Sequence, residues 1–384
     1  MDPVNIYQYS NPGRLLFGPG ALAELKKEIN VKDKPLIVTD EGVVRAGILK
    51  KVTDLLQEAG IRYELFDRVA ADPSIGVFEK AAALYKEKGC TSLIGLGGGS
   101  SIDVAKGVAI IATHEGTLKE YASGKPVEGV LPWLCAIPTT AGTGSESTAI
   151  TVVFDPESKV KMALKTPAIV PRLALLDPLL LASVPPKVAA ETGADALTHA
   201  IESYLAPSGH AITEALALSA VRMIMCNLLK FVANPHDVKA AGQMHLASCM
   251  AGLSMTNTGL GLVHALAHPA GAYFHASHGL YCAVYLPVVM EFNAPACPEK
   301  FVSLADAAGK DVRGLSPEEV SAEAIGAVRD LFAKLGLPRK LSEIGIRFEL
   351  QPKMVDDALE SRSAKNSPRK VEPEQVAALF NSAK

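Results

Sequence analysis

Short apolar runs alternate with amphipathic helical stretches through the first 177 residues, and this alternation constrains the fold more than any other feature. PLIVTD (35–40) is followed by GVVRAGILKKVTDLLQEAG (42–60), and SLIGLGGG (92–99) is followed by SIDVAKGVAIIATH (101–114). Continuous Val, Ile and Leu runs separated by helices are typical of parallel strands that are buried on both faces. This part of the chain therefore predicts a parallel sheet covered by helices.

The pattern changes near residue 186, which predicts a second domain. From there the Ala, Leu and Met positions follow a helical period throughout. Within the first part, AITVVFD (149–155) and VKMALK (160–165) flank a polar turn and predict a β-hairpin. We predict a Rossmann-like α/β domain with an inserted hairpin over residues 1–185 and an all-α domain over residues 186–384. The 384 residues, 48% of them hydrophobic, suffice for two cores.

Charge and cysteine usage exclude several classes of function. The net charge is −3 and the basic residues are scattered, which gives no electrostatic footprint for nucleic acid or an anionic membrane. No secretory leader pattern is present, and no apolar run approaches a membrane span. The six cysteines are far apart and form no CxxC pair, as expected for free thiols in a reducing compartment. We expect a cytoplasmic protein that binds neither nucleic acid nor membrane.

Four possible metal ligands lie in two helix-patterned stretches. Asp195 and His199 are four residues apart in GADALTHAIESY, so their side chains project from one helical face. His264 and His278 follow in GLVHALAHPAGAYFHASHG, where a second helix and a Gly- and Ser-containing turn can bring both rings to the same point. One carboxylate with up to three imidazoles suits iron(II), zinc, cobalt or nickel, and iron and zinc are the leading candidates.

A single histidine is more often a hydrogen-bonded core or surface residue than a metal ligand. The clustering favours a metal site here, because five of the nine histidines lie in these two stretches among Ala, Leu and Gly: His199, His264, His268, His275 and His278. Buried imidazoles without partners are costly, so a metal ion or a hydrogen-bond network must satisfy them.

Two polar turns in the first domain are candidates for phosphate binding. Gly97 to Gly99 follow an apolar strand and precede a helix, where backbone N–H groups can bind an anion. PTTAGTGSE follows the next strand and offers hydroxyl groups. Tight turn geometry alone also explains such glycines, but two turns at the carboxyl edge of one sheet favour a dinucleotide. Asp40 ends the strand PLIVTD and suits either a ribose 2′-hydroxyl or the cap of the next helix.

The motifs GGGSSIDVAK, IPTTAGTGSE, KVKMAL, ETGADALTHAIESY and GLGLVHALAHPAGAYFHASHG resemble those of the iron-containing (group III) alcohol dehydrogenases over nearly the whole chain. The resemblance implies a dinucleotide-binding domain, a helical metal domain, and at least a homodimer. It places His268 near the substrate and the nicotinamide. It implies metal binding by Asp195, His199, His264 and His278, and an NAD site lined by Asp40, Gly98, Gly99, Ser100, Thr139, Thr140, Thr143 and Lys161.

Some positions depart from the commoner family pattern. Met255-Thr256 stands where Phe-Asn is frequent, and His275-Ala276-Ser277 replaces a more usual Asp-Thr-Pro. We expect these residues to line or support the substrate pocket and to alter the choice of aldehyde. AKNSPRKV resembles an Asn-Pro-Arg segment of the family with Ser367 inserted.

The residues and the resemblance together predict an NAD(H)-dependent, divalent-metal-dependent alcohol dehydrogenase or aldehyde reductase for a small primary alcohol and aldehyde pair. A bound ion would act as a Lewis acid on the substrate oxygen. His268 is the candidate proton relay, with packing against His264 as its alternative role. Lys161 is the candidate partner of the nicotinamide ribose or, alternatively, a solvated strand lysine. A dehydroquinate-synthase-like lyase and a non-redox metallohydrolase stay open as alternatives.

Overall fold

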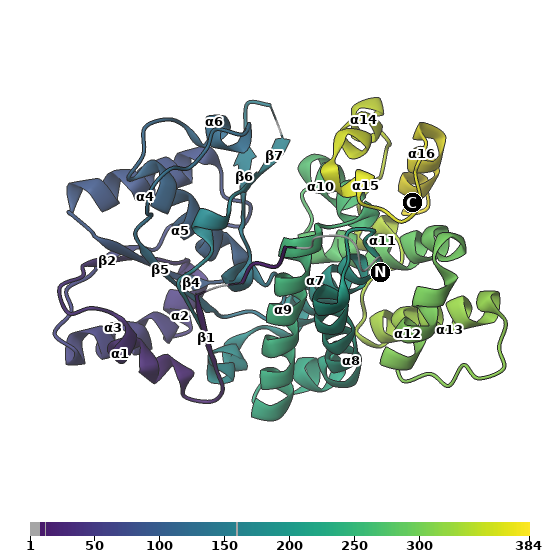
Figure 1. The fold of residues 1–384 in the computed structure, drawn as a ribbon, viewed down its shortest axis with the longest axis horizontal. Helices are drawn as coiled ribbons and strands as arrows, with labels where there is room; N and C mark the ends of the chain where they lie inside the picture. Colours follow the sequence, from purple (N-terminus) through teal and green to yellow (C-terminus); the bar gives the residue numbers. More distant parts are fainter. Residues whose placement is uncertain (1–7, 12, 159) are drawn as a thin grey trace. The chain divides into compact units, whose positions relative to one another are not determined.

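A computed structural model describes residues 8–11, 13–158 and 160–384. The chain forms two compact units (Figure 1). One comprises residues 10–184, and the other comprises residues 185–384 together with Tyr9, whose ring meets the His210 ring edge-on at 6.3 Å between centroids.

The first unit contains a six-stranded sheet in which every neighbouring pair of strands is parallel. This confirms the predicted fold class. The N-terminal strand lies at one edge of the sheet. The spatial order is β1 (Arg14–Phe17), β8 (Leu173–Leu176), β5 (Trp133–Pro138), β4 (Ser92–Gly97), β2 (Pro35–Val38) and β3 (Glu64–Phe66).

The order of the strands reverses at β2. The chain passes from β2 outward to β3 and then returns to place β4 on the other side of β2. Loops that leave the carboxyl ends of β2 and β4 therefore diverge from a topological switch point, where α/β sheets bind their ligands. Asp40 follows β2 and Gly98 follows β4, so the sheet topology brings these two candidate residues to the same edge.

Alternating residues of the strands build two cores, one on each face of the sheet. Leu36 and Leu93 pack with the core under α4 (Ile75–Glu87) and α5 (Gly99–Ile111). Ile37 and Ile94 face the opposite core, which includes residues of three further elements: η1 (Ala21–Glu24), α1 (Leu25–Glu28) and α3 (Ile48–Glu58). Figure 1 shows these helices on the two sides of the sheet. Burial on both faces explains why the strands read as continuous apolar runs.

One predicted helical stretch, residues 42–60, is divided in two. It forms α2 (Glu41–Arg45) and α3, because Gly47 adopts a left-handed conformation with φ of 73° and ends the first helix. A shorter helix, α6 (Leu118–Ala122), follows α5. The predicted hairpin is present as antiparallel β6 (Ile150–Asp155) and β7 (Val160–Lys165).

The second unit is helical, as predicted, and is built around α7 (Pro186–Leu205). This helix packs against five others, and almost every residue from Ala189 onward is buried. Asp195 and His199 are therefore interior residues. The remaining helices are α8 (Ala211–Ala233), α9 (Val238–Thr258), α10 (Leu262–Phe274), α11 (His278–Asn293), α12 (Pro298–Ala307), α13 (Pro317–Lys334), α14 (Pro352–Glu360), α15 (Arg362–Lys365) and α16 (Pro373–Asn381).

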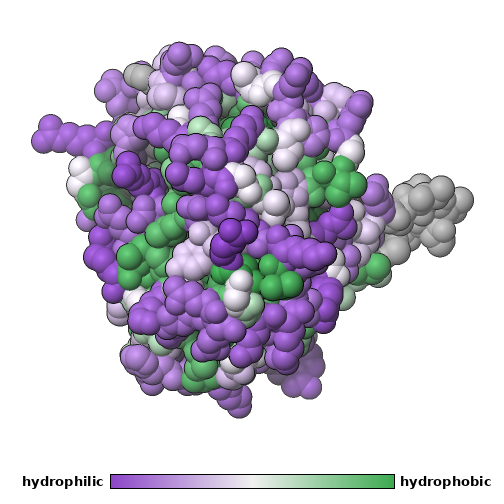
Figure 2. All heavy atoms as spheres, turned by 90° about the vertical axis from the view of Figure 1, so that its left-hand side faces the viewer, coloured by the Kyte–Doolittle hydropathy of each residue, from purple (hydrophilic) through white to green (hydrophobic). Residues whose placement is uncertain are grey.

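Helix α8 corrects one expectation, because by length and composition it is apolar enough to cross a membrane. In the structure it packs against α7, α9, α12 and α13. Two of its charged residues pair with α12: Glu214 with Lys300 at 3.1 Å and Arg222 with Asp306 at 2.6 Å. These contacts describe a bundle helix, whose apolar content serves packing. Figure 2 views the molecule from the side of the α/β unit, and this face is largely hydrophilic with apolar residues in patches between polar ones.

His245 is an unusual buried group in α9. The residue is 1% exposed, and neither of its ring nitrogens has a hydrogen-bond partner among the described residues. Burial lowers the pKa of His245 to about 3. The ring is therefore neutral in the folded chain, whereas in the unfolded chain it takes up a proton below about pH 6.5.

The folded chain should lose stability as the pH falls below about 6.5, because only the unfolded chain binds this proton. From His245 alone, the free energy of unfolding should fall by about 2 kcal/mol between about pH 7 and about pH 5. His245→Leu should remove that part of the pH dependence in urea denaturation, and His236→Leu, at an exposed position, should keep it. An unchanged pH dependence in His245→Leu would contradict a neutral buried ring.

Candidate functional site

Asp195 is the centre of the polar cluster in the helical unit. Its Oδ1 atom lies 3.3 Å from His199 Nε2, 3.6 Å from His264 Nε2 and 3.6 Å from His278 Nε2. Two nitrogen or oxygen ligands of one tetrahedral ion, each bonded at about 2.1 Å, lie roughly 3.4 Å apart. The structure therefore brings the Asp195 carboxylate within 3.6 Å of a ring nitrogen of each of the three predicted histidine ligands, which suits a shared ion.

Three helices supply these side chains. Asp195 and His199 lie one turn apart on α7, His264 lies in the first turn of α10, and His278 is the first residue of α11. His278 had been expected within the preceding turn. That turn ends instead at Ser277, after His275 has ended α10 in a left-handed conformation with φ of 56°.

A close approach of α11 to α7 places His278 beside Asp195. A Cβ atom at Gly279 would lie 2.1 Å from the backbone oxygen of Glu191, so no other residue fits there without a shift of the helix. Ser277 donates a hydrogen bond to Glu191 Oε2 at 2.7 Å and fixes the same junction.

The imidazole rings form one continuous group. His264 stacks on His199 with 4.8 Å between centroids and contacts His278 at 5.1 Å. His268, one turn further along α10, stacks on His278 at 5.4 Å and meets His264 at 5.8 Å. The structure thus places His268 next to the predicted ligands, on a half-buried position.

The electrostatics of the cluster favour a cation. Burial alone would raise the pKa of Asp195, but the neighbouring imidazoles of His199, His278 and His264 hold it well below its ordinary value. Burial alone would lower the pKa of His264, yet the Glu202 and Asp195 carboxylates outweigh this effect and raise it. His264 Nε2 is buried and has no hydrogen-bond partner within the described part of the chain. A divalent ion would satisfy both the orphaned nitrogen and the excess negative charge.

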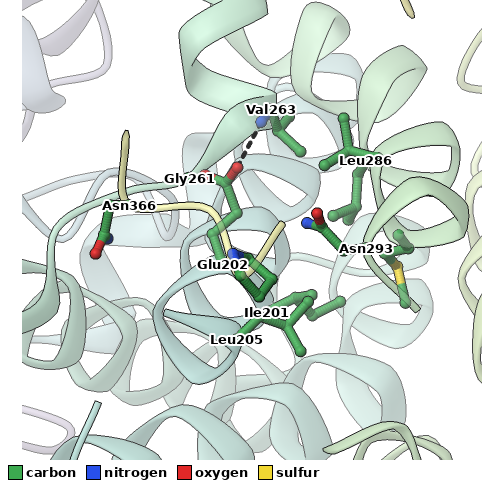
Figure 3. A pocket seen from close by; sticks show the side chains of 11 residues that line it. Ile201, Glu202, Leu205, Gly261, Val263, Leu286, Asn293 and Asn366 are labelled. Atoms are coloured by element: carbon green, nitrogen blue, oxygen red, sulfur yellow. Dashed lines mark hydrogen bonds between the residues drawn. The ribbon is translucent and has the colours of Figure 1, made fainter. Parts of the chain in front are cut away.

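Glu202 is a candidate site residue that the sequence analysis missed. One of its oxygens accepts a hydrogen bond from the His264 Nδ1 atom at 2.6 Å. The other accepts one from the Val263 backbone N–H, also at 2.6 Å (Figure 3). The bond to Nδ1 leaves Nε2 free to face Asp195, as in carboxylate–histidine–metal arrangements. A Cβ atom at Gly261 would lie 2.9 Å from Glu202 Oε1, so glycine makes room for the carboxylate. The sequence did contain a signal for Glu202, because Asp195, His199 and Glu202 are spaced so that they lie on one helical face.

A small cavity lies behind this carboxylate (Figure 3). Its volume is about 10 Å³, and its lining is mostly apolar apart from Glu202, Asn293 and Asn366. That volume holds about one water molecule, so this cavity is not a substrate pocket.

The C-terminal segment around Asn366 holds the loop that precedes α10. Asn366 Nδ2 donates to the backbone oxygens of Thr258 and Leu260 at 2.9 and 3.1 Å. Ser367 donates to Asn293 Oδ1 at 3.0 Å. The segment whose role was open from the sequence therefore positions the start of the helix that carries His264.

Cys282 is a second group that sequence reasoning missed. Its Sγ atom lies 3.4 Å from Asp195 Oδ1 and 3.6 Å from His278 Nε2. Asp195, His264, His278 and Cys282 each offer a ligand atom, and these four atoms all lie within 4.8 Å of one another. The signal in the sequence was the spacing of four residues between His278 and Cys282 on one helix.

The carboxyl edge of the sheet carries the candidate nucleotide site of the other unit. Asp40 caps α2 by accepting a hydrogen bond from Val43 N–H at 3.0 Å, and Ser101 donates to its other oxygen at 3.3 Å. Gly97 has φ of 145°, and a Cβ atom there would lie 2.6 Å from Ser101 Oγ. Gly98 precedes α5 without a side-chain cap, so the first N–H groups of this helix are available to an anion.

The threonine turn packs against the glycine turn. A Cβ atom at Gly99 would lie 2.8 Å from the Thr143 side chain, and one at Gly98 would lie 3.5 Å from Thr140 Oγ1. Thr139 N–H donates to Gly97 O at 3.0 Å. The structure therefore joins Gly98, Gly99 and Ser100, the second residue of α5, with Thr139, Thr140 and Thr143 in one cradle.

A buried network fixes this cradle. Lys106 of α5 is fully buried and donates to Ser145 Oγ at 3.0 Å and to Thr148 Oγ1 at 2.9 Å. Asp103 accepts a hydrogen bond from Ser145 Oγ at 2.6 Å. Burial lowers the pKa of Lys106 to about 8, and Asp103 opposes that shift. The two charged residues of the IDVAK segment thus hold the threonine turn against its helix.

Lys161 lies on β7, and its ammonium group forms an ion pair with Asp72 at 2.7 Å. The Lys161 side chain is 8% exposed and that of Asp72 is 53% exposed. Its role at a nucleotide stays a prediction.

Two family patterns cover nearly the whole chain. Residues 12–178 match "Iron-containing alcohol dehydrogenase", and residues 189–384 match "Fe-containing alcohol dehydrogenase family, C-terminal". The chain belongs to the iron-containing alcohol dehydrogenase family. The resemblance noted from the motifs is thereby confirmed.

Relatives within this family are similar over their full lengths. The 1,3-propanediol dehydrogenase of Klebsiella pneumoniae is 36% identical over 382 residues, which cover 98% of this chain and 99% of the relative. The crystal structure of a 1,3-propanediol oxidoreductase has a TM-score of 0.96 at 36% identity and covers 99% of this chain and 100% of its own. The sulfoacetaldehyde reductase of Bifidobacterium kashiwanohense, solved with NAD+, has a TM-score of 0.89 at 26% identity over 99% of both chains. This chain is accordingly an oxidoreductase for alcohols and aldehydes.

Glu202→Gln should weaken zinc binding about 10- to 100-fold, because the neutral amide no longer orients and polarises the His264 ring. A competitive titration against a coloured chelator measures the affinity. Glu214→Gln is the matched control, since that carboxylate pairs with Lys300 of α12 and not with a histidine of the cluster. Zinc affinity equal to that of the native protein would show that Glu202 only packs beneath α10.

Proposed function

We propose that this chain is an NAD(H)- and divalent-metal-dependent alcohol dehydrogenase or aldehyde reductase that acts on a small primary alcohol and aldehyde pair. The observation that carries the proposal is the Asp195 cluster, in which one buried carboxylate faces three imidazole nitrogens at 3.3 to 3.6 Å. The donors suit iron(II) or zinc. The family to which the chain belongs favours iron, and zinc is the alternative.

Each residue of the cluster has a distinct part in this proposal. Asp195, His199, His264 and His278 would hold the ion, whose chemistry is to polarise the substrate oxygen. Glu202 fixes the ring of His264 so that its Nε2 atom faces the ion. His268 lies beside His264 and His278 and would move the proton between the substrate oxygen and solvent.

The carboxyl edge of the sheet would hold the cofactor, which supplies or accepts the hydride. The N–H groups at the start of α5 and the hydroxyls of Thr139, Thr140 and Thr143 suit the pyrophosphate. Asp40 suits the ribose 2′-hydroxyl, and it keeps one oxygen for the α2 cap while doing so. Lys161 would contact the nicotinamide ribose, since an ammonium that donates to Asp72 retains two further protons. The NAD+ complex of the sulfoacetaldehyde reductase supports this choice of cofactor.

Mixing the metal-loaded protein with NADH and short aldehydes or polar aldehydes tests the proposal. NADH absorbance should fall in proportion to the aldehyde consumed, and His264→Ala should abolish both the signal and the bound metal. His236→Ala, an exposed histidine of the same unit, should retain both. A lyase would show no net change in NADH, and a metallohydrolase would not bind NADH. Full metal occupancy in His264→Ala would overturn the ligand assignment.

Asp40 should set the cofactor preference, because its carboxylate repels a 2′-phosphate. The native protein should prefer NADH to NADPH, and Asp40→Asn should narrow that preference about 10- to 100-fold. Asparagine can still cap α2, so the thermal midpoint should change little, whereas Asp40→Ala should lose about 1 kcal/mol through the lost cap. The measurement is kcat/KM for NADH and for NADPH in each variant. An unaltered ratio in Asp40→Asn would leave Asp40 as a helix cap alone.

A further inference from the structure

We propose that Asp103 and Lys106 are positioning residues for the cofactor, and that they set the span between its pyrophosphate and its nicotinamide ribose; this inference rests on the proposed NAD(H) site. The two residues lie three positions apart on α5, so their side chains project from one helical face. Lys106 is 0% exposed. Both residues act on the cofactor through the segments that they hold.

The first of these segments is the threonine turn, which leads into η2 (Ser145–Ser147). Lys106 Nζ donates to the Ser145 backbone oxygen at 2.5 Å and to Ser145 Oγ at 3.0 Å, and Ser145 Oγ donates to Asp103 Oδ1 at 2.6 Å. The Ser145 N–H in turn donates to Thr143 Oγ1 at 3.3 Å. This bond occupies a lone pair of the Thr143 hydroxyl and leaves its proton to donate to an anion.

The second segment is the first strand of the hairpin, which the same two residues tie to α5 at three successive positions. Lys106 Nζ donates to the Ile150 backbone oxygen at 2.9 Å. The Thr151 hydroxyl donates to the Asp103 backbone oxygen at 2.9 Å, and the Val152 N–H donates to Asp103 Oδ2 at 2.9 Å. Strand β6 therefore has a fixed position relative to the helix whose first N–H groups form the candidate pyrophosphate site.

The hairpin carries this position to the other end of the candidate cofactor site. Strand β6 pairs with β7, and Lys161 lies opposite Phe154 in that ladder. The network thus determines where the Lys161 ammonium, the proposed partner of the nicotinamide ribose, lies relative to the start of α5. A span that is set before binding lowers the entropic cost of holding a ligand that contacts both ends.

The use of charged groups in this interior agrees with a positioning role. Well-packed apolar residues often stabilise an interior as well as a buried pair of charges does. They cannot fix the turn and the strand by directed hydrogen bonds, whereas the Lys106 ammonium has three protons for acceptors in both segments.

Calorimetric titration of Lys106→Met with adenosine, ADP and NADH tests the proposal, because the three ligands reach successively further along the site. Adenosine affinity should stay within about twofold of that of the native protein, ADP affinity should fall about 10-fold, and NADH affinity should fall about 100-fold. Lys86→Met, which changes an exposed lysine of α4 in the same unit, should leave all three affinities unchanged. Equal losses for ADP and NADH, or no loss for either, would overturn the proposed span.

Thr151→Val tests the tie to the hairpin while both charges stay in place, so it also serves if Lys106→Met does not fold. It removes the hydroxyl that donates to Asp103, and NADH affinity should fall about fivefold with ADP affinity unchanged. Unchanged NADH affinity in Thr151→Val would contradict the proposal. A native protein that binds neither ADP nor NADH would instead overturn the proposed cofactor site, and this inference with it, so the two failures are distinguishable.

Discussion

A buried carboxylate surrounded by imidazoles is the constraint on which the helical unit depends. Asp195 is 4% exposed on a helix that is almost wholly interior, and removing charge from water is costly unless a partner compensates. The compensation here comes from helices far apart in sequence, which must approach α7 closely. Gly279 lets α11 contact the Glu191 backbone, and Gly193 lets α8 place Leu228 against α7. A bound cation would add its binding free energy to the stability of the unit, since the unfolded chain has no such site.

The α/β unit uses a second buried ionic network for a different purpose. Lys106 donates hydrogen bonds to Ser145 and Thr148, and Asp103 accepts one from Ser145. These bonds fix the turn that carries the threonine hydroxyls. A cradle held in this way presents backbone N–H groups and hydroxyls in a set geometry before any ligand arrives, which lowers the entropic cost of binding. Both units thus place the polar atoms of their candidate sites on elements that buried hydrogen bonds support.

Most of the fold was predictable because it depends on local patterns. Apolar runs gave the parallel strands, and the spacing of Asp195 and His199 placed two donors on one helical face. Glu202, Cys282 and Asp72 were missed because their importance depends on partners distant in sequence: His264, Asp195 and Lys161. The sequence analysis also overlooked that α8 is long and apolar enough to cross a membrane. Its packing against four helices and its ion pairs with α12 show that it is a helix of the bundle. Gly47 divided a stretch whose amphipathic pattern alone indicated one helix.

We propose that Asp195 is the common ligand of one ion shared by side chains from α7, α10 and α11. Anomalous diffraction at the zinc edge from zinc-loaded crystals tests it most directly, because it locates the metal without reference to activity. The account predicts one strong peak bonded to the Asp195 carboxylate and to ring nitrogens of its histidine neighbours, at about 2.0–2.2 Å. A fully loaded crystal whose strongest peak lies away from Asp195 would contradict it.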